Sequence, residues 1–130
     1  MLIKGRLVER VRERGPRLRE ELQSALQGNK LVHEVRGRGF LLGVELVDPR
    51  DGKSMLPDGL HVADRVEDAA FARGLMVGST HSNADGYTGD EILLAPAFTS
   101  SDQELALMVE RLAATLAEVE GWVGSKMVRA

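Results

Sequence analysis

The stretch that decides the fold is "HEVRGRGFLLGVELVDPRDG", residues 33–52, which has glycines at positions 37, 39 and 43. After Gly39 the apolar residues alternate with a period of two, which is typical of a strand with one buried face. A dinucleotide-binding loop requires a helix after its glycines, because the helix N-terminus faces the phosphates. Here a strand follows, and the third glycine has the wrong spacing. The stretch therefore predicts a β-hairpin, in which Gly43 permits close packing.

Hydrophobic periodicity predicts the elements that flank this hairpin. The leading helix is expected over residues 2–28, with a kink or a break at Gly15-Pro16, because a proline inside a helix lacks the backbone donor. The hairpin strands are expected at residues 31–36 and 40–47, a second helix at 60–73, and two further short strands at 75–77 and 92–95.

Ser101 and Glu104 form a capping box that opens a third helix. Its apolar stripe consists of Leu105, Met108, Val109, Leu112 and Leu116. We expect Gly121 to end this helix, so that residues 1–121 form the domain and residues 122–130 a tail. The order α-β-β-α-β-β-α predicts an α/β fold: a two-layer sandwich with helices on one face of a small, mostly antiparallel sheet.

The composition excludes several classes of protein. The 130 residues are 43% hydrophobic and 28% charged, the balance of one globular domain. Without cysteine the chain forms no disulfide framework or cysteine zinc site, and no apolar run reaches the ~20 residues of a membrane helix. The net charge of -3 argues against nucleic-acid binding. The basic stretch from Arg6 to Arg19 is interleaved with glutamates, which indicates a solvated helix face with i,i+4 pairs. A cytoplasmic location is the expectation.

The residues themselves show no catalytic constellation. The loop "HSNADGYTGDEI", residues 81–92, partly matches a calcium loop, but His81 and Ile92 stand at its first and twelfth positions, where acids are required. It is read as a polar turn. The histidines at 33, 61 and 81 have no metal-ligand spacing, and there is no nucleophile elbow. The lysines at 4, 30, 53 and 126 stand in polar or terminal contexts that do not depress a lysine pKa.

Three stretches together resemble the C-terminal segment of the class III pyridoxal-phosphate-dependent aminotransferases, the group of ω-amino-acid and ornithine transaminases. They are "VRGRGFLLGVEL" (35–46), "VADRVEDAAFARGLMV" (62–77) and "GDEILLAPAFTSSDQEL" (89–105). The resemblance implies a fold-type-I enzyme, usually a homodimer, in which this chain is the small domain. The missing large domain would carry the lysine that binds pyridoxal 5'-phosphate, so the chain alone is expected to bind no cofactor and to be inactive.

The resemblance also suggests which residues face a substrate. In the family, the loop before "GD" and the segment matching Ala95 to Phe98 close over the small amino or oxo substrate. The candidates are therefore His81, Asn83, Tyr87, Pro96 and Phe98. Some ω-transaminases bind a second carboxylate with an arginine where this chain has Gly86, and no arginine occurs between positions 73 and 111. A histidine common after "GD" is Glu91 here.

Two other classes of protein stay open at this point. The chain could be a free-standing α/β ligand-binding or regulatory module that shares only the architecture, or an interaction domain that dimerises through its sheet or first helix. If it is a fragment of a longer enzyme, the side chains of Leu2, Ile3, Leu7 and Val11 are expected to form an exposed apolar patch.

Overall fold

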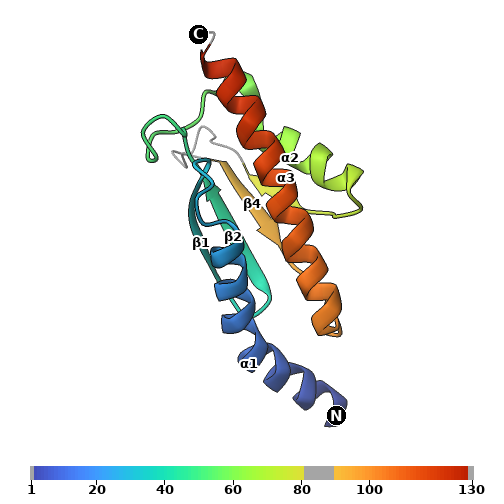
Figure 1. Ribbon diagram of the computed structural model, residues 1–130. Helices are drawn as coiled ribbons and strands as arrows, with labels where there is room; N and C mark the ends of the chain where they lie inside the picture. The colour runs from blue at the N-terminus through green and yellow to red at the C-terminus, as the bar shows by residue number, and fades with distance from the viewer. Residues whose placement is uncertain (1, 81–89, 129–130) are drawn as a thin grey trace.

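The computed structural model describes residues 2–80 and 90–128, without the side chains of residues 2–4, 58 and 128. The elements follow the predicted order (Figure 1). They are α1 (Leu2–Ala25), β1 (Val32–Arg38), β2 (Leu41–Leu46), the short 3-10 helix η1 (Asp58–Leu60), α2 (Val62–Ala72), β3 (Gly78–Thr80), β4 (Asp90–Leu94) and α3 (Asp102–Val128). Within the described part of the chain, no helix combines the length and the apolar character needed to cross a bilayer.

The strands form one antiparallel sheet of four strands in the order β1-β2-β4-β3. β1 and β2 are the predicted hairpin, since Arg38 pairs with Leu41 across a two-residue turn. On β2, Leu42 and Val44 are buried while Leu41 is 61% exposed. The hairpin and the alternation of its faces are therefore confirmed.

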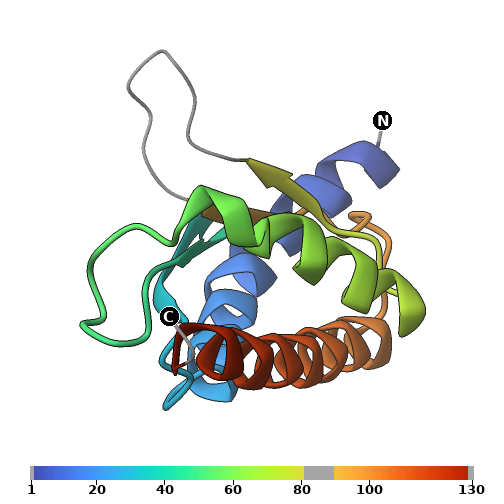
Figure 2. The same ribbon diagram turned by 90° about the horizontal axis from the view of Figure 1, so that it is seen from above.

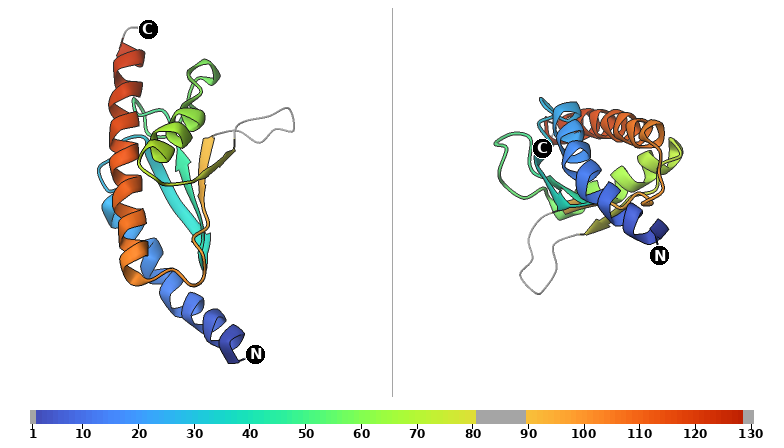
Figure 3. Two further views of the ribbon diagram at one scale, coloured as in Figure 1. Left: turned by 90° about the vertical axis from the view of Figure 1, so that its right-hand side faces the viewer. Right: turned by 90° about the horizontal axis from the view of Figure 1, so that it is seen from below.

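The helices cover one face of the sheet, so the predicted two-layer architecture is also confirmed. Figure 3 (left) shows α3 along one side of the sheet, and Figure 2 shows α2 beside α3. The core between the layers joins Leu18 and Leu22 of α1 to Val44 and Ile92 of the sheet. The predicted stripe of α3 completes the core with its buried residues Leu105, Met108, Val109, Leu112 and Leu116.

Of the kink or break expected at Gly15-Pro16 the break is absent, and the end expected for the third helix at Gly121 is wrong. α1 passes through Pro16 and ends at Ala25, and α3 passes through Gly121 and ends at Val128, so the tail expected from residue 122 is helical as far as residue 128. An interior proline costs a helix about 3 kcal/mol and a glycine about 1 kcal/mol. Core burial on both sides offsets these costs. Leu18 and Leu22 follow Pro16, and Val123 and Met127 follow Gly121.

The third strand also begins later than predicted. Residues 75–77 do not pair. β3 starts at Gly78, opposite Leu93 of β4. The backbone N–H of Leu75 instead donates to the carbonyl of Ala70, and that of Gly74 donates to Phe71. The backbone of Gly74 and Leu75 therefore closes the C-terminal end of α2, and the chain joins the sheet only after these residues.

The first helix lies very close to the hairpin turn. A Cβ added to Gly15 would stand 2.6 Å from the carbonyl oxygen and 2.8 Å from the Cα of Gly39, which are backbone atoms without room to rotate away. Gly39 itself has a φ of 59°, a value that favours glycine. Beyond this contact the N-terminal turns of α1 extend past the sheet (Figures 1 and 3). Val11 is buried, so it does not belong to the exposed patch expected for this end.

This contact predicts opposite effects for one substitution at two helical glycines. Gly15→Ala should lower the free energy of unfolding by about 1–3 kcal/mol, because the added methyl group overpacks against Gly39. Gly121→Ala should raise it by up to ~1 kcal/mol, because nothing lies within 4 Å of that position and alanine favours the helix. Urea unfolding followed by circular dichroism measures both variants. Equal effects at the two positions would contradict the close approach.

Candidate functional site

The residues proposed to face a substrate fall into two groups in the structure. His81, Asn83 and Tyr87 lie outside the described residues, and so does Gly86. Pro96 and Phe98 lie on the connection between β4 and α3. Pro96 is half-buried, and the ring of Phe98 is exposed, with 49% of the residue accessible. This connection, residues 95–100, is called the substrate-side segment below.

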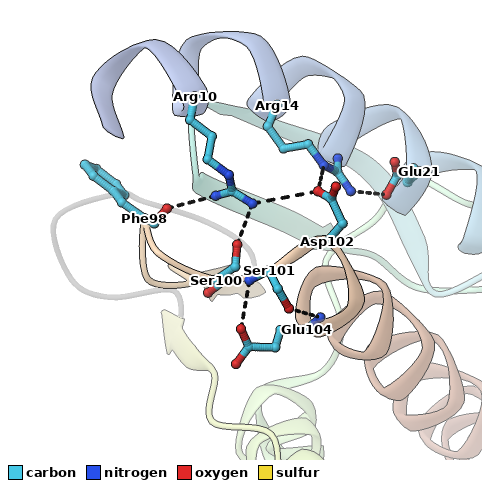
Figure 4. Close-up of polar contacts among 8 residues, drawn as sticks. All are labelled: Arg10, Arg14, Glu21, Phe98, Ser100, Ser101, Asp102 and Glu104. Carbon is cyan, nitrogen blue, oxygen red and sulfur yellow. Dashed lines mark hydrogen bonds and ion pairs between the residues drawn. The ribbon is translucent and has the colours of Figure 1, made fainter. Parts of the chain in front are cut away.

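Arg10 of α1 holds the substrate-side segment by its backbone (Figure 4). Its Nη1 donates to the carbonyl oxygen of Phe98 at 2.8 Å, and its Nη2 donates to the carbonyl of Ser100. The Arg10 guanidinium also lies 5.7 Å from the centre of the Phe40 ring. Phe40 meets Phe98 edge to face, with ring centres 6.1 Å apart. The hairpin turn therefore contacts the Phe98 ring, while α1 binds the backbone of the same residue.

Arg14, one turn later on α1, joins the same segment to the start of α3. Its Nε donates to Oδ1 of Asp102 at 2.9 Å, and its Nη2 donates to Oε2 of Glu21 at 3.1 Å. Burial alone would lower the pKa of Arg14, but the hydrogen bonds to Asp102 and Glu21 outweigh it and raise that pKa. The hydrogen bond from Arg14 in turn lowers the pKa of Asp102. Both groups are therefore charged at neutral pH, as an ion pair with one buried partner.

The predicted capping box closes the other end of the segment. The backbone N–H of Ser101 donates to Oε1 of Glu104 at 2.8 Å, and the backbone N–H of Glu104 donates to Oγ of Ser101 at 3.1 Å. The hydrogen bond from the Ser101 backbone lowers the pKa of Glu104, which keeps this carboxylate ionised. Because the segment ends in a paired strand and a capped helix, its conformation is set at both ends.

The roles of Arg10 and Arg14 correct the prediction of a solvated basic face. In the described residues neither arginine forms an i,i+4 pair. Arg10 donates to residues 88 and 90 positions away, and Arg14, which is 7% exposed, donates to Asp102, 88 positions away, as well as to Glu21 on its own helix. The sequence does hold a signal for this arrangement. Arg10 and Arg14 stand four residues apart, in line with Leu18 and Leu22 on the buried stripe of the helix. A charged residue that stands in line with the buried apolar residues of a helix can be a buried, paired residue as well as a solvated one.

Glu91, where the resembling family often has histidine, belongs to the outer face of the sheet. Its Oε2 forms an ion pair with Nη2 of Arg36 at 2.8 Å. Nη1 of Arg36 forms a second ion pair with Oε2 of Glu45 at 3.4 Å. A Cβ at Gly43 would stand 2.7 Å from the same Glu91 oxygen. The close packing predicted at Gly43 is therefore confirmed, and a side chain of β4 occupies the space. The hydrogen bond that Arg36 donates to Glu91 raises the pKa of Arg36.

The described residues offer no catalytic group in the substrate-side segment, but they fix its conformation. The substrate-side segment offers an apolar ring and a rigid backbone, whereas the lysines at 30, 53 and 126 are exposed on other parts of the surface. His33 and His61 are exposed as well, and no group of three potential metal ligands occurs among the described residues. This arrangement can shape a pocket and exclude water from it.

Comparisons with known proteins agree with this geometry. The sequence profile of the family Aminotransferase class-III matches residues 1–116. The uncharacterized aminotransferase YodT of Bacillus subtilis is 31% identical over 119 residues, which cover 92% of this chain and 27% of that protein.

Solved structures of transaminases superpose on the chain. A transaminase from the marine bacterium Virgibacillus superposes with a TM-score of 0.82 at 25% identity, over 94% of this chain and 27% of that one. A PMP-bound aminotransferase from Vibrio fluvialis superposes with a TM-score of 0.75 at 26% identity, over 90% and 24%. The chain thus spans about a quarter of the length of the proteins it matches. It belongs to the class III aminotransferase family.

Proposed function

We propose that this chain is the small C-terminal domain of a pyridoxal-phosphate-dependent aminotransferase that transfers an amino group between an amino acid or amine and a 2-oxo acid. The observation that carries the proposal is the family match over residues 1–116 of a chain that spans a quarter of its relatives. The domain supplies a wall of the substrate pocket through Pro96 and Phe98. The parent enzyme is proposed to be a cytoplasmic homodimer.

The described residues do not fit the cofactor itself. A lysine that binds pyridoxal phosphate as an imine must lose its proton near neutral pH, against an ordinary pKa of about 10.4. Burial or a neighbouring cation achieves this. Lys30, Lys53 and Lys126 are instead exposed to solvent. The cofactor and the catalytic lysine are therefore assigned to the large domain, which lies outside these 130 residues.

The substrate-side segment has properties suited to positioning a substrate. Phe98 presents half of its surface to solvent although its backbone carbonyl is bound by Arg10 and its ring contacts Phe40. A ring held in this way loses little further conformational entropy when it packs against a ligand. Since the chain has no arginine between positions 73 and 111, we propose that an apolar contact rather than a second carboxylate clamp contributes to selectivity on this side.

The first expected outcome concerns cofactor binding. The purified 130-residue chain, mixed with pyridoxal phosphate and reduced with borohydride, should show no stoichiometric label on any one lysine, because Lys30, Lys53 and Lys126 lie at the exposed surface and not in a pocket that would hold the cofactor. Joined to its large domain, the same chain should give one labelled lysine in the large domain and measurable amino transfer. Mass spectrometry locates the label. A single lysine of the isolated chain labelled to completion, with turnover, would make the domain an enzyme by itself.

The second expected outcome concerns Phe98. In the full-length parent enzyme, Phe98→Ala should raise KM for a donor with an apolar side chain by about five- to thirtyfold, because the ring loses its contact with the substrate. Phe71→Ala is the matched control, since Phe71 is a phenylalanine of α2 that is 70% exposed and does not belong to this segment. The control should leave KM unchanged. Steady-state kinetics measures KM for both variants. If Phe98→Ala has the same KM as the unchanged enzyme, Phe98 does not line the substrate pocket.

A further inference from the structure

A groove runs between the middle of α1 and the turn of the β1–β2 hairpin, apart from the substrate-side segment. It has a volume of about 480 Å³. Its apolar lining consists of Val8, Val11, Pro16 and Leu42, and Val8 is 46% exposed. The glycines at 15, 37 and 39 form the remainder of the wall without side chains. The backbone of the hairpin turn is therefore accessible from the groove.

The rim of the groove carries positive charge that the described residues leave uncompensated. Arg12, Arg19 and Arg38 line it, and no carboxylate does. Arg19 donates from Nη1 to the carbonyl oxygen of Gly37 at 3.3 Å, which holds its guanidinium at the turn. The side chains of Arg12 and Arg38 form no hydrogen bond or ion pair within the described part of the chain.

Other arginines of the same elements, in contrast to Arg12 and Arg38, are paired. Arg10, Arg14 and Arg36 each contact at least one carboxylate. The chain as a whole is acidic, with a net charge of -3, so carboxylates are in excess over basic groups. Three arginines around an apolar floor thus form a local basic surface on an acidic chain. Arginine beside apolar side chains is also the composition enriched at protein interfaces.

We propose that this groove docks an acidic segment of the parent polypeptide that carries an apolar side chain and lies outside these 130 residues. The proposal rests on the proposed function, in which the chain is one domain of a longer enzyme, and on its coverage of about a quarter of its relatives. The apolar side chain of that segment packs on Val8 and Pro16, the exposed apolar residues of the lining. Its carboxylates accept hydrogen bonds from Arg12 and Arg38, whose planar guanidinium groups match carboxylates.

The test is a nuclear magnetic resonance titration of the ¹⁵N-labelled chain with a blocked probe peptide of sequence DELLED. Amide shifts should cluster at Val8, Gly37 and Gly39, and they should weaken as salt is added. The double variant R12Q/R38Q should bind the peptide about tenfold more weakly, because two charge pairs are lost. The control K30Q/K53Q removes the same charge at exposed lysines outside the groove and should bind within about twofold of the unchanged chain. Circular dichroism confirms that both variants are folded.

Further probes separate the docking segment from other occupants of the groove. The peptide DESSED, which lacks the apolar anchor, should bind about fivefold more weakly than DELLED. Equal binding of inorganic pyrophosphate at the same amides would show a free-anion site and overturn the proposal. So would a dimer of the chain that dissociates in R12Q/R38Q, since the occupant would then be a second copy. Absence of shifts with DELLED would overturn it too. None of these results depends on amino transfer or cofactor binding.

Discussion

The close approach of α1 to the hairpin turn is the constraint on which the other contacts depend. Gly15 and Gly39 touch through their backbones, so the distance between helix and turn is set where neither residue has a side chain. From this point the direction of α1 places Arg14 beside the start of α3 and Arg10 beside Phe98. A bulkier residue at the contact would move both arginines together. The position of the substrate-side segment therefore depends on two glycines that do not touch it.

Arg14 illustrates how the structure accepts an energetic cost for a defined geometry. Its side chain is 8% exposed, and its Nη1 atom has no partner within the described residues. A buried charge is costly unless it is paired, and Asp102 and Glu21 provide that pairing from opposite sides. An apolar side chain in the same place would pack without directional bonds, so it would not favour one rotation of α3 about its axis over another. The ion pair fixes α1 against the first residue of α3, where the substrate-side segment ends.

The parts of the fold that depend on local signals could be predicted from the sequence. The hairpin follows from glycines and alternation, the start of α3 from a capping box, and the core faces of α2 and α3 from apolar spacing. The errors arose where distant burial decides the outcome. α3 continues through Gly121, where the sequence predicted its end, because core contacts on both sides of this glycine outweigh the local penalty. Arg10 and Arg14 were missed as positioning residues, because the partners that they position, Phe98 and Asp102, each lie 88 residues away.

We infer that α1 from Val11 onward is part of one cooperative unit with the sheet. Hydrogen–deuterium exchange on the 130-residue chain, read at single residues by nuclear magnetic resonance, measures this directly. The backbone amides of Leu18 and Leu22 should exchange with the same free energy of opening as those of Val44 and Ile92, because all four residues share the core. Exchange of the α1 amides within seconds, while the sheet stays protected, would show that the helix is only loosely attached and would contradict this account.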